Sequence, residues 1–271
     1  MLFDIYHSVY IAISLVITVG ALILFRKMFT PPHGDTEANT CARVHGKADC
    51  LVLKISGILT VVIHISSIWV EFLITGSAVA YPNILFPIFF CNLSMYLLLI
   101  CGCIRNKTGK AYTWLATFTA YAGTIGALIS LFYPDFYLAQ PDFWDWGIFK
   151  SFLSHSTMMF GCLWLFTAGY VKIRVSNLLP YIAGLGGTWI VGMAINGLFA
   201  LCHLDPPNAM FLQQSAIEGV PFLNGYGIAL LMLALIFVFT AIWEFFACPK
   251  GTRWYDLLAK KFGKKQKDGA E

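Results

Sequence analysis

Seven runs of apolar residues, each long enough to cross a bilayer as a helix, constrain this chain more than any other feature. About 20 apolar residues span the ~30 Å hydrocarbon core of a membrane. Only 12% of the residues are charged, whereas a soluble domain carries about 25%. The sequence therefore predicts an all-α, polytopic membrane bundle of seven transmembrane helices, with spans near Ser8–Phe25, Leu51–Thr75, Asn83–Ile104, Tyr112–Tyr133, Gly147–Tyr170, Leu178–Cys202 and Phe222–Ala247.

The distribution of basic residues predicts the orientation of this bundle, because cytoplasmic loops are enriched in Lys and Arg. All 18 Lys and Arg residues except Lys150 lie in or beside the first, third and fifth loops or in the C-terminal tail. The fourth loop is acidic, with Asp135, Asp142 and Asp145. We expect the N-terminus outside and the C-terminus in the cytoplasm. Membrane orientation also explains the net charge of +4, so no nucleic-acid partner is expected.

The first apolar run is expected to remain in the protein as a span. The residues before it include Asp4 and His7 rather than Lys or Arg, and no small-x-small cleavage motif precedes Arg26. A secretory signal peptide has a positively charged n-region and such a cleavage motif, and this run lacks both. We expect an integral, multi-pass protein with membrane lipids as its partners, in the plasma membrane if the source is a bacterium.

Residues 1–250 are expected to form the transmembrane domain and residues 251–271 a basic cytoplasmic tail. In the tail, apolar side chains fall near one helical face, as in a helix that lies on an anionic leaflet: Trp254, Leu257, Leu258 and Phe262. A solvated tail that serves only as a topology signal accounts for the same residues. Glu244, near the end of the last span, is expected to snorkel or to pair with Lys250.

The eight cysteines do not form the pattern of a disulfide framework. Four of them lie within apolar runs, where a thiol packs as a small hydrophobic group: Cys91, Cys101, Cys103 and Cys162. The first loop also holds His33, Cys41, His45 and Cys50, whose spacing matches no common zinc site. We expect neither a metal nor an organic cofactor.

Polar side chains gather in the outer halves of several spans. Cys91 in the third span and His155 in the fifth each lie about eight residues from the outer end, a depth of ~12 Å at 1.5 Å per residue. Ionisable groups inside a membrane are costly and mark functional sites. Other polar residues converge on the same outer half from four spans: His64, Glu71, Asn92, Ser94, Asn196, Asn224 and Tyr226.

A thiol and an imidazole at one depth form a candidate nucleophile and base. Proximity to a histidine raises the thiolate fraction of a cysteine, and a neighbouring amide or hydroxyl can donate to a developing oxyanion. Asn92 and Ser94 are candidates for that donor. The alternative is structural: Cys91 packs as a small apolar residue and His155 forms a hydrogen bond between helices.

An aromatic segment, Pro134 to Trp146, occupies the fourth loop. Tyr and Trp are enriched where a membrane protein meets the headgroups, so the segment is expected to be an interfacial anchor. A second interpretation is that it guides a lipid tail toward the polar cavity.

Five short segments, in the same order, resemble the YwaF-like integral membrane proteins, which include the animal transmembrane protein 164. The segment from Leu85 to Leu93, LFPIFFCNL, is similar to the family's Leu-Pro-Leu-His-Leu-Cys-Asp/Asn-Leu. FLSHS, which contains His155, is similar to Phe-Leu-Ser-His-Gly, and Pro134-Asp135 to a Pro-Asp loop. Asn208–Leu212 resembles Asn-Tyr-x-Phe-Leu, and Gly219–Phe222 resembles Gly-Pro-Trp-Pro. This chain has Phe89 and Ala209 where the family has His and Tyr.

The resemblance implies a helical membrane bundle and a cysteine-dependent acyltransferase, or acyl hydrolase, that acts on phospholipids. Cys91 would accept the acyl chain and His155 would be its base. The remaining candidates would hold the oxyanion or position the substrate: Asn92, Ser94, His64, Asn196 and Asn208. The alternative function is a membrane carrier, or a lipid or small-solute binding protein, with no covalent step. Discontinuous helices favour such a carrier, and Pro87 and Gly76 are candidate breaks.

Overall fold

The computed structural model describes residues 4–29, 47–76, 84–133 and 144–260, which form helices and no strand. The prediction of an all-helical chain is confirmed. Much of the first loop with His33, Cys41 and His45, most of the aromatic segment and the end of the basic tail lie outside the described residues. The elements are α1 (Ile5–Phe29), α2 (Lys47–Ile65), α3 (Ser67–Thr75), α5 (Phe90–Cys103), α6 (Lys110–Phe132), α8 (Trp146–Thr167), η1 (Val175–Asn177), α9 (Leu179–Leu201), η2 (Ala209–Phe211) and α10 (Gly225–Ala247).

Each predicted run coincides with helical structure, but the lengths differ from the prediction. In the described residues, five segments are long and apolar enough to cross a membrane: Ile5–Met28, Lys47–Ile74, Lys110–Phe132, Val175–Leu201 and Gly225–Ala247. The helix α5 has only 14 residues. The helix α8 has 22 residues, and the small polar residues around His155 lower its mean hydropathy.

Two of the runs are interrupted, for identifiable reasons. In the third, the helix begins only at Phe90, after an irregular stretch that contains Pro87. Proline has no backbone N–H and disfavours helical backbone in the residue before it. In the second, α2 ends before Ser66, whose hydroxyl donates to the carbonyl of Ile63 at 2.6 Å, and α3 follows.

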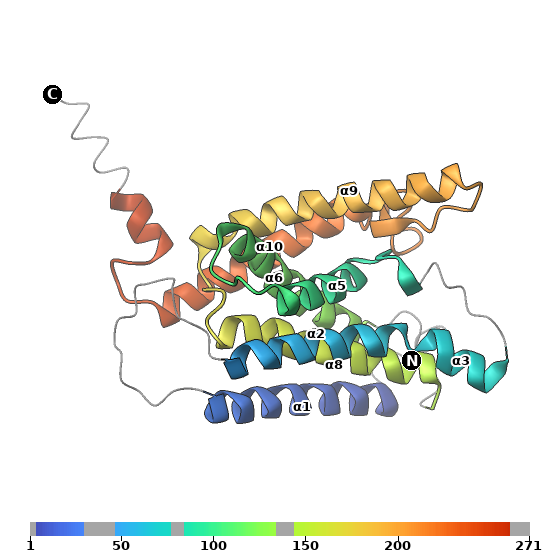
Figure 1. Cartoon of the computed structure of the whole chain (residues 1–271). Coiled ribbons are helices and arrows are strands. Elements are labelled where there is room, and N and C mark those ends of the chain that lie inside the picture. The colour runs from blue at the N-terminus through green and yellow to red at the C-terminus, as the bar shows by residue number, and fades with distance from the viewer. Residues whose placement is uncertain (1–3, 30–46, 77–83, 134–143, 261–271) are drawn as a thin grey trace.

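The helices run alternately in opposite directions (Figure 1). The helix α8 lies at the centre of one half of the bundle and packs against α1, α2, α3, α5 and α6. The helices α9 and α10 lie together on the far side of α6 from α1. The start of α1 and the end of α10 lie at opposite ends of the bundle.

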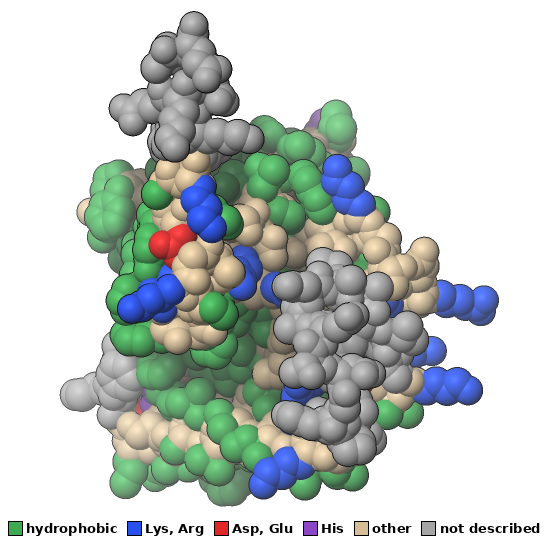
Figure 2. All heavy atoms as spheres, turned by 90° about the vertical axis from the view of Figure 1, so that its left-hand side faces the viewer, with side chains coloured by type: hydrophobic (Ala, Val, Ile, Leu, Met, Phe, Trp, Pro, Cys, Tyr) green, Lys and Arg blue, Asp and Glu red, His purple; other side chains and the backbone are tan. Residues whose placement is uncertain are grey.

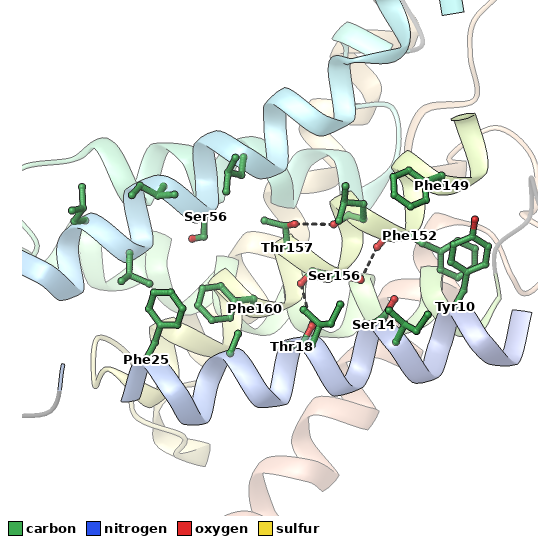
Figure 3. Close-up of a pocket in the computed structure, with 18 of the residues that line it drawn as sticks. Tyr10, Ser14, Thr18, Phe25, Ser56, Phe149, Phe152, Ser156, Thr157 and Phe160 are labelled. Atoms are coloured by element: carbon green, nitrogen blue, oxygen red, sulfur yellow. Dashed lines mark hydrogen bonds between the residues drawn. The ribbon is translucent and has the colours of Figure 1, made fainter. Parts of the chain in front are cut away.

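The helix α1 is attached along one side of the bundle (Figure 3). The buried His7 imidazole donates from Nε2 to the carbonyl of Leu131 in α6 at 2.8 Å. Tyr10 stacks on Phe152 of α8, with ring centroids 4.3 Å apart. Further along, the Thr18 hydroxyl donates to the carbonyl of Ser156 at 3.5 Å.

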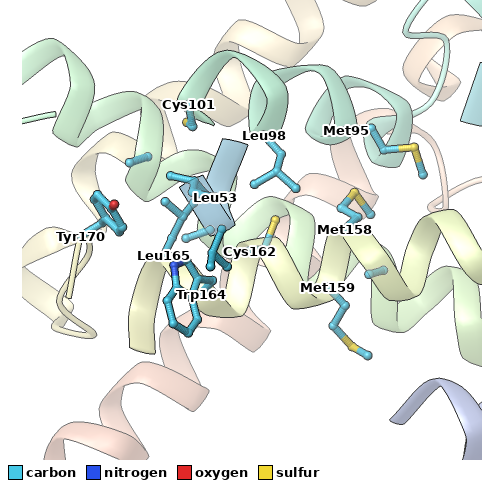
Figure 4. Close-up of a cluster of buried hydrophobic side chains, with 14 of the residues drawn as sticks. Leu53, Met95, Leu98, Cys101, Met158, Met159, Cys162, Trp164, Leu165 and Tyr170 are labelled. Atoms are coloured by element: carbon cyan, nitrogen blue, oxygen red, sulfur yellow. The ribbon is translucent and has the colours of Figure 1, made fainter. Parts of the chain in front are cut away.

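The helices α2 and α5 approach one another closely because glycines face the partner backbone. A Cβ on Gly57 would lie 2.7 Å from the Cα of Leu99, and one on Gly102 would lie 2.8 Å from the Cα of Lys54. Small residues permit this kind of contact between membrane helices. The hydrophobic core next to it is drawn in Figure 4 and includes Leu53, Met95, Leu98, Cys101, Met158, Cys162, Trp164 and Leu165.

One end of the bundle is rich in Lys and Arg (Figure 2). Lys107 closes the end of α5 there: its ammonium donates to the carbonyls of Cys101 and Ile104, each at 2.7 Å. A cation at this position satisfies carbonyls that have no partner within the helix and complements the helix dipole. Partial burial lowers the pKa of Lys107.

Glu244 does not pair with Lys250 as the sequence suggested. Its carboxylate is buried, accepts from Arg174 Nη1 at 3.2 Å, and accepts from the backbone N–H of Val175 at 2.9 Å. The expectation was wrong because η1 folds back against α10 and brings the arginine to the carboxylate, which proximity along the chain did not indicate. After α10, residues 254–260 form a short helix, and Trp254 contacts Phe237 at 5.9 Å between ring centroids.

We expect Gly57→Ala to destabilise the protein by about 1–3 kcal/mol, because the added methyl group forces α2 away from α5. The control is Gly20→Ala in α1, where an added Cβ has nothing within 4 Å, so stability should be unchanged or slightly raised. Thermal unfolding of the detergent-solubilised full chain measures both. Equal midpoints for the two variants would contradict the close contact.

Candidate functional site

Cys91 lies in the first turn of α5, next to α6. The side chain is half-buried, and its thiol donates to Oδ1 of Asn92 at 3.4 Å. On the α6 side, a Cβ added to Gly126 would lie 3.8 Å from the Cβ of Cys91. The space between α6 and this turn is therefore only about as large as a methyl group, and Asn92 accepts the thiol proton.

His155 lies in α8 and is 7% exposed. Its Nδ1 is 2.7 Å from the carbonyl oxygen of Ser151, one turn earlier in the same helix. Because a carbonyl only accepts hydrogen bonds, Nδ1 carries the proton, which leaves Nε2 as the acceptor atom of the ring. Nε2 is buried and has no hydrogen-bond partner in the described part of the chain. Buried polar atoms without partners are rare and need an explanation.

Cys91 and His155 occupy similar depths on neighbouring helices, but no hydrogen bond joins them among the described contacts. The helices α5 and α8 run in the same direction, and Met95 and Met158 belong to one buried cluster (Figure 4). Cys91 precedes Met95 by four residues and His155 precedes Met158 by three. Each candidate therefore lies about one helical turn from these methionines, toward the N-terminal end of its helix.

His64, in α2, makes its hydrogen bond to the segment that leads into α5. Its Nε2 donates to the carbonyl of Ile84 at 3.1 Å, and the hydroxyl of Tyr96 donates to the same carbonyl at 3.2 Å. The ammonium of Lys150 donates to the backbone carbonyl of His64 at 3.4 Å. His64 thus ties α2 to the segment that leads into α5.

Ser94 is fully buried, and its hydroxyl donates to the carbonyl of Phe90 at 2.9 Å. This bond lies within α5, so the hydroxyl is already occupied. Asn92 accepts the Cys91 thiol proton through Oδ1. Of these two candidates for an oxyanion donor, Asn92 is therefore the one in direct contact with Cys91.

Asn196 and Asn208 organise the loop around η2. The carboxamide of Asn196 accepts from the backbone N–H of Ala209 at 2.8 Å. Asn208 has a left-handed backbone with φ of 51°, and its Oδ1 accepts from the backbone N–H groups of Gln213 and Gln214, each at 3.0 Å. These two residues hold the loop in place and make no described contact with Cys91.

The loop at η2 meets the segment just before Cys91. The backbone N–H of Met210 donates to the carbonyl of Ile88 at 2.8 Å, and the rings of Phe89 and Phe211 are 5.4 Å apart. Gly225 faces the Met210 carbonyl so closely that an added Cβ would clash with it. Two segments that are more than 100 residues apart in the sequence, Leu85–Leu93 and Asn208–Leu212, are therefore neighbours.

The sequence analysis missed Ser151, Tyr96 and Lys150 as parts of this region. Ser151 lies four residues before His155, and such a pair shares a helical face. That spacing was a usable signal. Tyr96 and Lys150 reach the site through backbone carbonyls of other helices, for which the sequence holds no signal. Within the described residues, no group of three or more His, Cys, Asp or Glu is arranged to hold a metal ion.

Comparison with known proteins gives one match. The model of the TMEM164 family matches residues 2–246 of this chain. No curated protein and no solved structure was found to match it. The matched residues include every described helix except the last residue of α10 and the short helix that follows it. The chain therefore belongs to the TMEM164 family and is an integral, multi-pass membrane protein.

Proposed function

We propose that this protein is a cysteine-dependent acyltransferase, or acyl hydrolase, of phospholipid acyl chains, in which Cys91 is the nucleophile and His155 the base. The observation that carries the proposal is the unpartnered Nε2 of His155. A structural histidine in an apolar bundle would use both ring nitrogens or be replaced by an apolar residue, because an unpaired buried polar atom costs free energy.

The resting arrangement suits His155 to act as a base. The Ser151 carbonyl fixes the proton on Nδ1, so the lone pair of Nε2 is available to accept a proton. A carbonyl partner also stabilises the imidazolium that forms, because Nδ1 remains a donor in both protonation states. Nε2 at the depth of Cys91 is the group that this reaction requires.

The reaction begins when the Cys91 thiol transfers its proton to His155 Nε2 and the sulfur attacks the ester carbonyl of a phospholipid. The C–O bond of the tetrahedral intermediate breaks, and the imidazolium returns the proton to the leaving alkoxide, which departs as a lysophospholipid. A hydroxyl of an acceptor lysolipid, or water, then gives its proton to His155 and attacks the thioester. Cys91 leaves as the thiol and a new ester or a free acid remains.

Asn92 and His64 have supporting roles in this proposal. When the thiol proton leaves, Asn92 loses its hydrogen-bond donor, so its carboxamide can turn its NH₂ group toward the developing oxyanion. His64 keeps the Ile84 carbonyl in place, while Asn196 and Asn208 hold the loop that contacts Ile88. These residues set the position of the first turn of α5 relative to His155. Ser94 remains within its helix.

The same proposal includes seven spans with the N-terminus outside. Because the helices alternate in direction, the end of α1 with Arg26, the start of α2 at Lys47, the α5–α6 loop and η1 all lie at the basic end of the bundle (Figures 1 and 2). Cytoplasmic positioning of Lys and Arg is the general rule for such proteins. Cys91 and His155 then lie in the outer half of the membrane.

A non-covalent carrier or binding protein is the second candidate. The irregular residues 86–89 before α5, and the end of α3 at Gly76 with φ of 67°, are helix breaks of the kind that line substrate sites in transporters. In the break before α5, however, the carbonyl of Ile88 already accepts from the N–H of Met210, and the carbonyl of Ile84 just before it accepts from His64 and Tyr96. If removal of the Cys91 thiol had no effect on phospholipid chemistry, this second candidate would be favoured.

Cys91→Ser should lower the rate of acyl transfer by about a thousandfold, because a serine hydroxyl is much less acidic than a thiol and is therefore a poorer nucleophile here. Cys103→Ser in the same helix is the control: Cys103 is exposed, and such a change should leave the rate within about twofold. The assay uses the full chain in liposomes of phosphatidylcholine with deuterated acyl chains, with lysophosphatidylethanolamine as acceptor and mass spectrometry as readout. Equal rates for both variants would remove Cys91 from the mechanism.

His155→Gln should slow alkylation of Cys91 by iodoacetamide about tenfold or more. The imidazole accepts the thiol proton and so raises the fraction of Cys91 that is thiolate, the form that reacts. Glutamine still offers an N–H to the Ser151 carbonyl. His64→Gln is the matched control, since its imidazole donates to Ile84 and is not the base. Mass spectrometry of the Cys91 peptide over time gives both rates. If the two variants label alike, His155 is not the base.

Two exposed cysteines test the orientation. Cys202 follows α9 and Cys103 ends α5, and they lie toward opposite ends of the bundle. In intact cells, a membrane-impermeant maleimide should label Cys202, and Cys103 only after permeabilisation. The opposite pattern would place the N-terminus in the cytoplasm.

A further inference from the structure

A long cavity lies between α1, α2 and α8 (Figure 3). Its volume is about 860 Å³. Leu153, Ser156 and Phe160 line it from α8, whereas His155 and Met158, which share another face of this helix, do not. Neither Cys91 nor His155 is among its lining residues. The cavity is therefore separate from the proposed reaction site.

The cavity runs along the helices for most of a span. Tyr10 and Trp146 line one end, and Phe25 and Ala48 line the other. About 15 residues of α1 separate Tyr10 from Phe25, which corresponds to about 22 Å at 1.5 Å per residue. Half of the hydrocarbon core is about 15 Å thick. An extended acyl chain of one leaflet fits along this length.

The walls offer little to a polar ligand. The hydroxyls of Ser56 and Ser156 donate to the carbonyls of Leu53 and Phe152 at 2.9 and 2.7 Å. The hydroxyls of Thr18 and Thr157 likewise donate to backbone carbonyls, at 3.5 and 2.8 Å. Because these hydroxyls are satisfied within the protein, the surface that remains, apart from Ser14, is mainly that of aliphatic and aromatic side chains. Such a lining suits a hydrocarbon chain.

One end of the cavity has the features of a membrane interface. Trp144 lines it and is 87% exposed, and Trp146 donates from its indole N–H to the Ser66 hydroxyl at 3.2 Å. Tryptophan is enriched at the headgroup level of a membrane.

We propose that this cavity is a structural lipid site that binds one acyl chain of a phospholipid, with the headgroup at the Trp144–Trp146 end. The chain fills the space between α1 and α2 and completes the attachment of α1, which packs mainly on α8. The site differs from the reaction site in position and takes no part in bond breaking. Its occupancy does not depend on Cys91.

Photocrosslinking of the full chain tests this proposal. The chain is placed in phosphatidylcholine nanodiscs that contain increasing fractions of a phosphatidylcholine with a diazirine in the middle of one acyl chain. Mass spectrometry then locates the adducts. Adducts on the α8 wall, at Phe152 to Phe160, should saturate at a low fraction of probe. Adducts on α10, whose Leu230 is 66% exposed, should rise in proportion to the fraction of probe, as for bulk lipid.

Filling the cavity should remove the saturable adducts. Ala21→Trp and Leu59→Trp add bulk from the α1 and α2 walls and should each lower labelling of the α8 wall about tenfold, the loss expected when a pocket is occupied by a side chain. Val19→Trp and Val62→Trp are the controls, because these residues are 50% and 45% exposed on the same helices and do not line the cavity. Gel filtration confirms that each variant is folded.

Three results would overturn the proposal: labelling of the α8 wall that rises with probe as on α10, equal labelling in the cavity variants and their controls, or crosslinks between two copies of the chain at the cavity in place of lipid adducts. None of these depends on acyl transfer. If Cys91→Ser abolished activity but kept the saturable labelling, the lipid site would still stand. If the cavity showed no saturable labelling but acyl transfer still depended on Cys91, the proposed enzyme would still stand.

Discussion

The contact between α2 and α5 is the constraint on which the rest of the structure depends. Between membrane helices the surrounding lipid supplies no hydrophobic drive, so association relies on close packing of small residues and on hydrogen bonds. Gly57 and Gly102 bring the two backbones so near that a methyl group on either would require movement of the partner. This contact places α5 against α8 and thereby fixes the depth of Cys91 relative to His155.

The break before α5 explains much of the polar chemistry that the sequence displays. Residues 86–89 cannot satisfy their backbone groups within a helix, and at membrane depth such groups need partners. The N–H of Met210 donates to the carbonyl of Ile88, while His64 and Tyr96 donate to the carbonyl of Ile84 just before this stretch. Several residues that look catalytic from composition alone therefore serve the backbone. Among the buried side-chain nitrogen and oxygen atoms of the described residues, Nε2 of His155 has no hydrogen-bond partner, and neither do the hydroxyls of Ser67, Tyr112 and Tyr181.

The helix α8 separates two environments. One face carries His155, Met158 and Cys162, of which the last two pack in the core with α2, α5 and α6, and the other carries Leu153, Ser156 and Phe160 toward the cavity beside α1. Residues three and four apart share a helical face, so a single sequence of 22 residues encodes both. In our proposals the first face does chemistry on a phospholipid and the second holds one in place.

The sequence by itself determined the class of protein and the helical segments, because a run of apolar residues near 20 long has few alternatives to a membrane helix. It also singled out Cys91 and His155, because polar residues are rare in such runs. It did not determine the partners of the polar groups: Glu244 bonds to Arg174 rather than to Lys250, and Asn196 and Asn208 hold a loop. Nor did it reveal the cavity beside α1. These features were decided by the tertiary structure, because hydrogen-bond partners and cavities arise where helices that are distant in sequence meet. The hydropathy of a residue describes only its preference for water or lipid and does not indicate which helix it will contact.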